Sequence, residues 1–280
     1  MALTRGWLAL GRLGVLGLAL LADLAGAACS RPISVPMAPT GLSVYFQGEQ
    51  ALGIYPSLLR DLSARLPCDF RMRQVPRARQ LMLFESGQLD LFIPATEVPA
   101  RAEFGEFVPL VQARIALVAL GDGRALPGSV PELLAASDLR VAVVRSYSYG
   151  PAYDALITTL RERRRLLEET DPASVARALQ MGLAQVSLIH PLTLMGVMVT
   201  EPALAPLLRE VHTGTLPEFG WTTSGAYLST RSLGESDRRL LKQALVEAAR
   251  SQAVWRQVTQ IASIAQQHNG MRPLPANLLP

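Results

Sequence analysis

The sequence contains few of the residues on which several classes of protein depend. Its 280 residues include only two cysteines and three histidines. Two cysteines cannot form a disulfide scaffold or a cysteine-based zinc ribbon, and the scattered histidines form no closely spaced pair of metal ligands. Beyond residue 28, no apolar stretch reaches the roughly 18 residues that a membrane-spanning helix needs. A polytopic membrane protein is therefore excluded, and we expect neither a metal nor a cofactor.

Charge is also scarce, at 18% of residues, whereas hydrophobic residues make up 49%. A chain this apolar can bury a large core, which excludes global disorder, and its length suits one large or two modest domains. The most basic segment, Arg161–Arg165, lies on a helical pattern and has acidic neighbours at Glu168 and Glu169. This pattern is typical of a solvated helix face, so we expect no nucleic-acid partner.

Residues 1–28 have the three parts of a secretory signal peptide. Arg5 and Arg12 give a positive start, residues 13–22 form an apolar core, and residues 25–28 are the small side chains of a cleavage site. A membrane anchor is the alternative, but the core is short for a span. We therefore predict an exported, periplasmic protein.

Cys29 follows this segment directly and has two competing interpretations. Residues 26–29 (GAAC) resemble a lipobox, the motif at which exported proteins are lipidated, although that motif prefers Leu where Gly26 stands. Cys29 is thus a candidate lipidation site, and a lipid anchor would be the only link to a membrane. Alternatively, Cys29 pairs with Cys68 in a disulfide, because the predicted compartment is oxidising.

Beyond residue 28, strand-like and helix-like segments alternate. Short apolar runs bounded by turn residues predict strands, and apolar residues three and four apart predict helices, several of which start at a proline or an aspartate cap. Such alternation is typical of an α/β fold with largely parallel sheets. The predicted strands are 33–37, 43–47, 89–93, 115–120, 141–144 and 186–189; the predicted helices are 56–66, 76–85, 151–167, 172–181 and one or two within 235–267; residues 271–280 are expected to be irregular.

One arrangement occurs twice. Residues 81–93 have the order helix, glycine and buried strand, and residues 178–189 repeat it. Both copies lead into a segment that contains a proline, Pro94 in the first and Pro191 in the second. Ligands of open α/β sheets bind beyond the carboxyl ends of the strands. We therefore predict that these two segments face a ligand between two similar α/β units.

Three segments carry a resemblance that extends from residue 33 to residue 265. Gly53–Leu62 is similar to a helix start of the form Gly-hydrophobic-x-x-Asp-Leu, and Leu81–Ile93 to a helix–strand of the form Leu-x-x-Gly-x-x-Asp. Thr96–Phe104, followed by Phe107–Leu110, is similar to the block Thr-x-Thr-x-x-Arg…Phe-Ser-x-Pro-Tyr. In this order, the segments resemble the periplasmic solute-binding proteins of the polar amino acid class (solute-binding protein family 3).

This resemblance implies a two-lobed periplasmic-binding-protein-like fold of type II, with two hinge crossings near Ile115–Leu120 and Ser224–Ser229. Lobe 1 would comprise residues 29–119 plus 225–280, and lobe 2 residues 120–224. The resemblance also implies a monomer that captures a small polar solute in the cleft and closes on it like a hinge. The closed form would dock on an inner-membrane permease of an ABC transporter for amino acid transport, or on a sensor.

The resemblance also implies that Arg101 holds a carboxylate of the ligand. A guanidinium can donate two parallel, charge-assisted hydrogen bonds to a carboxylate. The family's arginine in this block holds the α-carboxylate, and a threonine five residues before it, here Thr96, assists. The family's second threonine is replaced by Val98. The alternative is that Arg101 is a surface arginine near a strand end.

The second lobe departs from the family pattern. An aspartate that pairs with the ligand ammonium usually follows the second buried strand, but His190 occupies that position. A neutral imidazole cannot provide the charge, and a protonated imidazole would repel an ammonium. An ordinary amino acid ligand is therefore in doubt, and a carboxylate without a cationic group, or another small polar solute, fits as well. The alternative for His190 is a local hydrogen bond at the strand end.

The remaining candidates lie at element ends. Arg145–Gly150 follows a strand and precedes a helix, and both this segment and Pro76–Arg79 resemble a poorly characterised subgroup of the family. Backbone N–H groups at a helix start attract anions, although an ordinary turn is the alternative. The candidate ligand contacts are Arg145, Ser146 and Tyr147 in this segment, Tyr45 as an aromatic wall of the first lobe, and Arg77, which either faces the cleft or is solvated.

Two enzymatic alternatives have weaker support. Ser146–Gly150 resembles a hydrolase nucleophile elbow, but Ser146 stands where the motif has its first glycine. The fold also occurs in periplasmic dehydratases of prephenate-like acids, yet no general acid stands out. We therefore predict a protein that binds a solute for uptake or sensing and is not an enzyme. The sequence does not separate a transport receptor from a module for sensing or envelope assembly.

Overall fold

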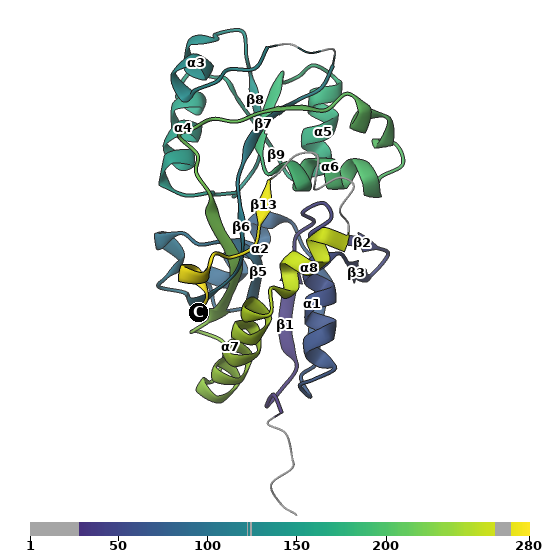
Figure 1. Cartoon of the computed structure of the whole chain (residues 1–280), viewed down its shortest axis with the longest axis vertical. Helices are drawn as coiled ribbons and strands as arrows, with labels where there is room; N and C mark the ends of the chain where they lie inside the picture. Colours follow the sequence, from purple (N-terminus) through teal and green to yellow (C-terminus); the bar gives the residue numbers. More distant parts are fainter. Residues whose placement is uncertain (1–27, 122, 124, 261–269) are drawn as a thin grey trace, which may run out of the picture.

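The computed structural model describes residues 28–121, 123, 125–260 and 270–280. The predicted signal segment, apart from Ala28, lies outside these residues, as does the end of the last predicted helix. The described chain forms two α/β halves that are stacked along the long axis of the molecule (Figure 1). The predicted α/β class is therefore confirmed. None of the described helices is long and apolar enough to cross a membrane.

The first half is built around a four-stranded antiparallel sheet of order β13-β6-β12-β5, beside the parallel pair β1-β4. Its core collects the apolar faces of α1, α7 and α8. Gly87, in the left-handed region at φ 66°, ends α2 as predicted. The elements are β1 (Ile33–Met37), β2 (Tyr45–Gln47), β3 (Gln50–Leu52), α1 (Ile54–Ser63), β4 (Phe70–Gln74), α2 (Arg77–Glu85), β5 (Leu91–Thr96), η1 (Pro99–Arg101), β6 (Gly105–Ala113), β12 (Thr222–Ser229), α7 (Glu235–Arg250), α8 (Ala253–Gln260), β13 (Met271–Arg272) and η3 (Ala276–Leu278).

The second half contains a five-stranded sheet of order β11-β7-β10-β8-β9. β10, β8 and β9 are parallel, whereas β7 is antiparallel to both of its neighbours. One face packs on α4 and the other on α5 and α6, so β8 and β10 are buried throughout. The elements are β7 (Ala116–Ala119), α3 (Val130–Ala135), β8 (Val141–Val144), α4 (Pro151–Glu162), β9 (Leu166–Glu169), α5 (Pro172–Gln180), β10 (Val186–Ile189), α6 (Pro191–Thr200), η2 (Ala205–Arg209) and β11 (His212–Gly214).

The predicted helix 151–167 is wrong at its end. α4 stops at Glu162, the chain turns at Arg164 with φ 57°, and Leu166–Glu169 forms the edge strand β9. Leu166 and Leu167 follow the basic residues 161–165 at positions that continue the spacing of the helical leucines. The sequence pattern therefore does not reveal the turn at Arg164. Arg165 is also not part of a solvated face. It is 7% exposed, and its guanidinium donates to the carbonyls of Leu133, Leu134 and Leu139.

Several elements do not follow the predicted pattern. α6 was not predicted because its sequence, PLTLMGVMVT, is apolar on all sides and therefore has no helical periodicity. The sheet of the first half is antiparallel rather than largely parallel, since β6 and β12 are long strands that the sequence reading missed. Residues 271–280 are not wholly irregular, because β13 pairs with β6.

The chain passes between the halves twice, at residues 114–115 after β6 and at residues 215–221 before β12. The side chain of Trp221 lies at this junction. The guanidinium carbons of Arg114 and Arg272 are 5.0 and 4.3 Å from its ring centroid. The predicted lobe boundaries stay a prediction. Because β7 pairs with β10 in the sheet of the second half, the end of the first segment of lobe 1 is better placed at residue 113 than at residue 119.

The start of the described chain is fixed to the first half. Cys29 and Cys68 form a disulfide, Ser30 donates twice to Asp237, and the Arg31 guanidinium donates to both carboxylate oxygens of Asp90, at 2.6 and 2.7 Å. A sulfur in a disulfide cannot also carry a lipid thioether. The predictions of a disulfide and of lipidation at Cys29 therefore exclude each other, and the structure contains the disulfide.

We expect the Cys29–Cys68 disulfide to stabilise the fold by about 2–4 kcal/mol, because it closes a long loop and so limits the unfolded chain. Urea unfolding of the oxidised protein and of the protein reduced with dithiothreitol measures this difference. The double variant Cys29→Ser/Cys68→Ser is the control and should be insensitive to the reductant. Equal unfolding midpoints for the oxidised and reduced wild type would contradict the prediction.

Candidate functional site

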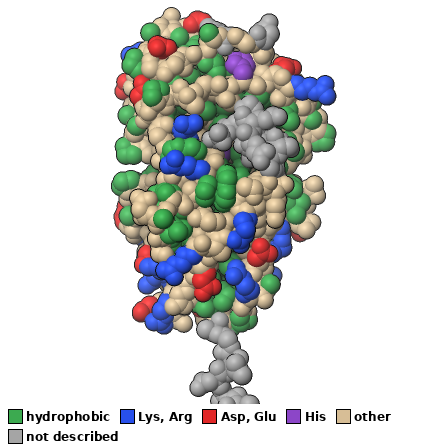
Figure 2. Space-filling view, in the orientation of Figure 1, with side chains coloured by type: hydrophobic (Ala, Val, Ile, Leu, Met, Phe, Trp, Pro, Cys, Tyr) green, Lys and Arg blue, Asp and Glu red, His purple; other side chains and the backbone are tan. Residues whose placement is uncertain are grey.

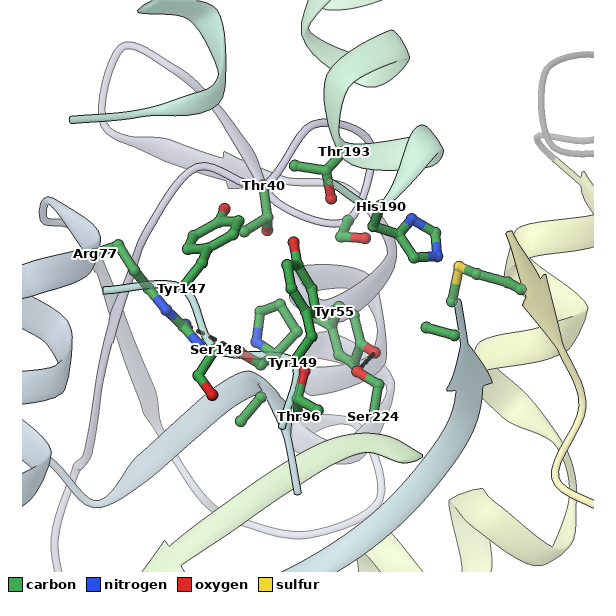
Figure 3. A pocket seen from close by; sticks show the side chains of 15 residues that line it. Thr40, Tyr55, Arg77, Thr96, Tyr147, Ser148, Tyr149, His190, Thr193 and Ser224 are labelled. Atoms are coloured by element: carbon green, nitrogen blue, oxygen red, sulfur yellow. Dashed lines mark hydrogen bonds between the residues drawn. The ribbon is translucent and has the colours of Figure 1, made fainter. Parts of the chain in front are cut away.

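A pocket lies between the two halves and contains about 560 Å³ of empty space, part of it open to solvent. Side chains from both halves surround it (Figure 3). Both predicted ligand-facing segments contribute, the first through Pro94–Thr96 and the second through His190. The lining residues are Thr40, Ser43, Tyr55, Arg77, Pro94, Ala95, Thr96, Ala113, Tyr147, Ser148, Tyr149, His190, Thr193, Ser224 and Met271.

Arg77 begins α2 and extends its guanidinium to the pocket. The side chain is 7% exposed, so Arg77 is not solvated. Nη1 donates to Gln80 Oε1 at 2.8 Å and to the Pro94 carbonyl at 3.1 Å. The guanidinium lies 4.4 Å from the ring of Phe92 and 5.5 Å from that of Tyr147. Burial lowers the pKa of Arg77 to about 10, and the positive charge of Arg101 adds to this effect.

The pocket contains polar atoms that the protein leaves without partners. Five buried side-chain atoms in the described residues lack a hydrogen bond, and three of them line this pocket: Thr40 Oγ1, Arg77 Nε and Tyr147 OH. Buried polar atoms are almost always paired, because an unpaired one costs about 1–3 kcal/mol. Three such atoms thus belong to residues around one cavity, where a polar ligand or water can supply the missing partners.

Arg101 is buried but does not line the pocket. It belongs to η1 and is 4% exposed. Its Nη1 donates to the carbonyl of Thr96, which does line the pocket, at 2.9 Å, and its guanidinium lies 5.2 Å from the Phe92 ring. The alternative of a surface arginine is thus excluded. The predicted contact between Arg101 and a ligand carboxylate stays a prediction.

His190 caps α6 directly after β10 and lines the pocket. Its Nε2 is 2.6 Å from the carbonyl oxygen of Gly270. Because a carbonyl only accepts, Nε2 is the donor. Burial lowers the pKa of His190 to about 4, so the imidazole is neutral near pH 7. His190 therefore contributes no positive charge to the pocket. Its hydrogen bond to Gly270 connects the second half to the residue that precedes β13.

The other predicted residues divide into two groups. Tyr147 lines the pocket, together with Ser148 and Tyr149 from the same turn. Tyr45, Arg145 and Ser146 do not line it. Tyr45 lies in the β2–β3 hairpin, and Arg145 is exposed. Ser146, at φ 65°, lines a separate surface pocket beside α4.

Sequence reasoning missed several lining residues: Thr40, Ser43, Tyr55, Thr193 and Ser224. Thr40 and Ser43 lie in a loop, and Thr193 and Ser224 lie in elements that were not predicted, α6 and β12. Tyr55 lies within the Gly53–Leu62 motif, but the motif assigns no role to that position. Tyr55 OH lies 3.4 Å from Ser224 Oγ, and burial raises the pKa of Tyr55 to about 12. Burial likewise raises the pKa of Tyr147 and Tyr149, so these phenols stay protonated. None of the described lining residues is an Asp or Glu, so the positive charges of Arg77 and Arg101 have no counter-charge in the pocket.

Two glycines let the halves approach closely beside the pocket. A Cβ at Gly41 would clash with the carbonyls of Leu192 and Thr193. A Cβ at Gly196, in α6, would clash with the backbone of Gly41 and Leu42. The backbones of the two halves are therefore in direct contact at these glycines. Figure 2 shows basic and acidic side chains interspersed on the lower part of the visible face.

Solved structures share this architecture, although no protein family and no curated protein matches the sequence. A histidine kinase sensor domain with similarity to periplasmic binding proteins superimposes with a TM-score of 0.63 at 16% identity, over 87% of this chain and 98% of that one. The arginine-, lysine-, histidine-binding protein from Geobacillus stearothermophilus gives 0.65 at 13% identity, over 89% and 99%. An amino acid ABC transporter substrate-binding protein from Streptococcus pneumoniae, bound to L-arginine, gives 0.64 at 11%, over 87% and 95%. The chain thus has the two-lobed fold of periplasmic binding proteins, as predicted.

We expect the stability of the protein to fall in acid because of His190. The unfolded chain binds a proton near pH 6.5, whereas the folded protein does so only near pH 4. Between these values the unfolded state binds more protons, so this contribution is complete above pH 6.5 and is lost as the pH falls toward 4. At pH 4.5 the loss is about 2–3 kcal/mol.

Urea unfolding at pH 7.5 and 4.5 measures this loss. The variant His190→Gln keeps an N–H donor for Gly270 but does not titrate, so it should lose that much less stability than the wild type. An equal acid sensitivity in the two proteins would show that His190 is not the cause.

Proposed function

We propose that this protein is an exported solute-binding protein that captures a small polar, carboxylate-bearing solute between its two lobes. The single observation that supports it most is the set of three unpaired polar atoms, one of them on a buried guanidinium, around a pocket between the halves. A carboxylate supplies acceptors for the N–H groups of Arg77 and for the hydroxyls of Thr40 and Tyr147. Solved neighbours with this fold include binding proteins with bound arginine, which supports the same role.

The contact between the lobes supports a closing mechanism. Thr40 and Arg77 on one side and Tyr147 and Thr193 on the other reach the ligand together only when the lobes meet. A solute that contacts both sides therefore binds the closed form more tightly and shifts the equilibrium toward it. We propose residues 29–113 plus 222–280 and 114–221 as the approximate lobes, in place of 29–119 plus 225–280 and 120–224, because β7 pairs in the second sheet and β12 in the first.

Uptake and sensing are both supported by the solved neighbours. Those neighbours include substrate-binding proteins of amino acid ABC transporters and a sensor domain of a histidine kinase. The proposed partner of the closed form is accordingly an inner-membrane permease or a sensor. In either role the solute is released chemically unchanged.

Catalysis has less support than binding. A dehydratase needs a general acid, and the described lining residues include no carboxyl group, while His190 is neutral. In the elbow-like turn, the Ser148 hydroxyl donates to Asp154 Oδ2 at 2.8 Å. A nucleophilic serine requires a base to accept its proton, and Asp154 belongs to an exposed helix start rather than to the pocket.

We expect small carboxylates to raise the melting temperature of the purified protein, because a ligand that binds only the folded state stabilises it by mass action. A thermal-shift panel of organic acids and amino acids tests this, and the primary amide of each acid is the matched control. At least one acid should stabilise the protein while its amide does not, and the bound acid should be recovered unchanged. A panel in which no carboxylate shifts the transition would refute the proposal, and turnover of the ligand would refute the non-enzymatic role.

We expect Gly196→Ala to weaken solute binding at least about tenfold, because its Cβ would meet the backbone of Gly41 and Leu42 and keep the lobes apart. The fold should persist, since alanine stabilises a helix relative to glycine by about 1 kcal/mol. Gly234→Ala is the control, because a Cβ at that position meets nothing within 4 Å. Isothermal titration measures affinity, and small-angle scattering measures closure. Normal closure in Gly196→Ala would contradict the mechanism.

A further inference from the structure

We propose that Arg77, assisted by Thr40 and Tyr147, holds the anionic group of the ligand, and that the ligand is a small organic acid without any cationic group. This inference rests on the proposed function and specifies its ligand. It separates two classes that both carry a carboxylate, namely amino acids and the hydroxy or keto acids of the same shape.

The guanidinium of Arg77 presents an unused edge. Both protein acceptors, Gln80 Oε1 and the Pro94 carbonyl, are bound by Nη1. Within the described part of the chain, Nε has no partner and Nη2 donates to no protein atom. The N–H groups of Nε and Nη2 point along the same edge, which is a geometry that matches the two oxygens of a carboxylate. The edge belongs to a side chain that is 93% buried and lines the pocket.

Two hydroxyls extend this edge into a subsite. Thr40 Oγ1 and Tyr147 OH are buried and have no partner in the described chain, and Figure 3 shows the two hydroxyls near each other, at the end of the Tyr147 ring that points away from the Arg77 guanidinium. A hydroxyl can donate to an anionic oxygen, and the Tyr147 phenol stays protonated and able to donate, since burial raises its pKa. Arg77, Thr40 and Tyr147 thus supply a charge and several donors to one anionic group.

The electrostatics of the pocket disfavour a cation. Arg101 lies on the same Phe92 ring as Arg77 and is buried as well. Neither arginine forms an ion pair within the described chain, and none of the described lining residues is acidic. An ammonium brought into this low-dielectric space would lose its hydration, face two positive charges and find no carboxylate. A hydroxyl or keto group at the same place carries no such penalty.

His190 completes the distinction. It occupies the place on the second lobe where the resemblance expects a carboxylate, and its Nε2 donates to Gly270 rather than to the pocket. In the neutral ring the other nitrogen is an acceptor. The neutral His190 ring therefore cannot neutralise an ammonium.

Matched pairs of acids test the ligand class, because each pair differs only in a hydroxyl or an ammonium on C2: (S)-lactate against L-alanine, (S)-malate against L-aspartate, and (S)-2-hydroxyglutarate against L-glutamate. Isothermal titration measures the affinity of the purified protein for each. In at least one pair the hydroxy acid should bind at least about tenfold more tightly than the amino acid. An amino acid that binds as tightly as its hydroxy acid overturns this inference but leaves the proposed function intact. Absence of binding by all six compounds counts against both.

Substitutions test the assignment of the anion to Arg77. Arg77→Gln should lower the affinity for the bound acid at least about tenfold, whereas Arg79→Gln, an exposed arginine two residues further along α2, should not change it. Tyr147→Phe keeps the ring but removes the unpaired hydroxyl. It should weaken binding severalfold while the melting temperature of the free protein stays equal or rises, a combination that a merely structural role would not give. Full affinity in Arg77→Gln, with loss in Arg101→Gln, would place the anion on Arg101 and overturn the assignment.

Discussion

The site depends on a buried positive charge that the protein itself does not neutralise. Arg77 lies almost wholly out of water, stacked between Phe92 and Tyr147, and its bonds to Gln80 and Pro94 satisfy only one of its three nitrogens. A charge removed from water is costly unless it is paired. The fold accepts this cost because the rest of the first half is stabilised by a large apolar core and by well-paired ions such as Arg31 with Asp90. Burial would raise the pKa of Asp90, yet the bonds from Arg31 and Ser34 lower it, so this ion pair shows what a compensated buried charge looks like here.

In the proposed mechanism, the placement of the unpaired charge on Arg77 links solute binding to closure of the lobes. Arg77 comes from the first half, whereas Tyr147, which stacks over it, comes from the turn before α4 in the second half. Bringing the halves together removes the guanidinium from water before any anion is added, so the closed form without ligand carries the full cost. A ligand that supplies the missing charge removes that cost. Affinity and domain closure are then two measures of the same electrostatic free energy.

The sequence predicted the fold class and the two segments that line the pocket, because both rest on patterns that burial imposes; that these segments face a ligand stays a prediction. Buried parallel strands are apolar throughout, and Gly87 and Gly182 mark helix ends in each copy of the repeated unit. It did not predict α6 or the turn at Arg164, where uniform apolarity and continued leucine spacing conceal the element ends. Within the site, it identified Thr96, Tyr147, His190 and Arg77 as candidates but ranked Arg101 above Arg77. The motif shows which residue types occur near the cleft, whereas the direction of each guanidinium depends on how it packs over the Phe92 ring, and a sequence pattern does not show that packing.

The junction between the halves has a consequence for how motion of this protein can be observed. Trp221 lies on the returning crossing and stacks between Arg114, on the outgoing crossing, and Arg272, on β13. The three side chains belong to neighbouring positions at one end of β6, β12 and β13, where the chain leaves the sheet of the first half for the second half. Of the three tryptophans in the chain, Trp7 lies in the predicted signal peptide and Trp255 packs against the core of the first half. Trp221 alone among the described tryptophans lies at the junction of the halves, so a change in its emission on adding a solute would report, without a label, a rearrangement at that junction.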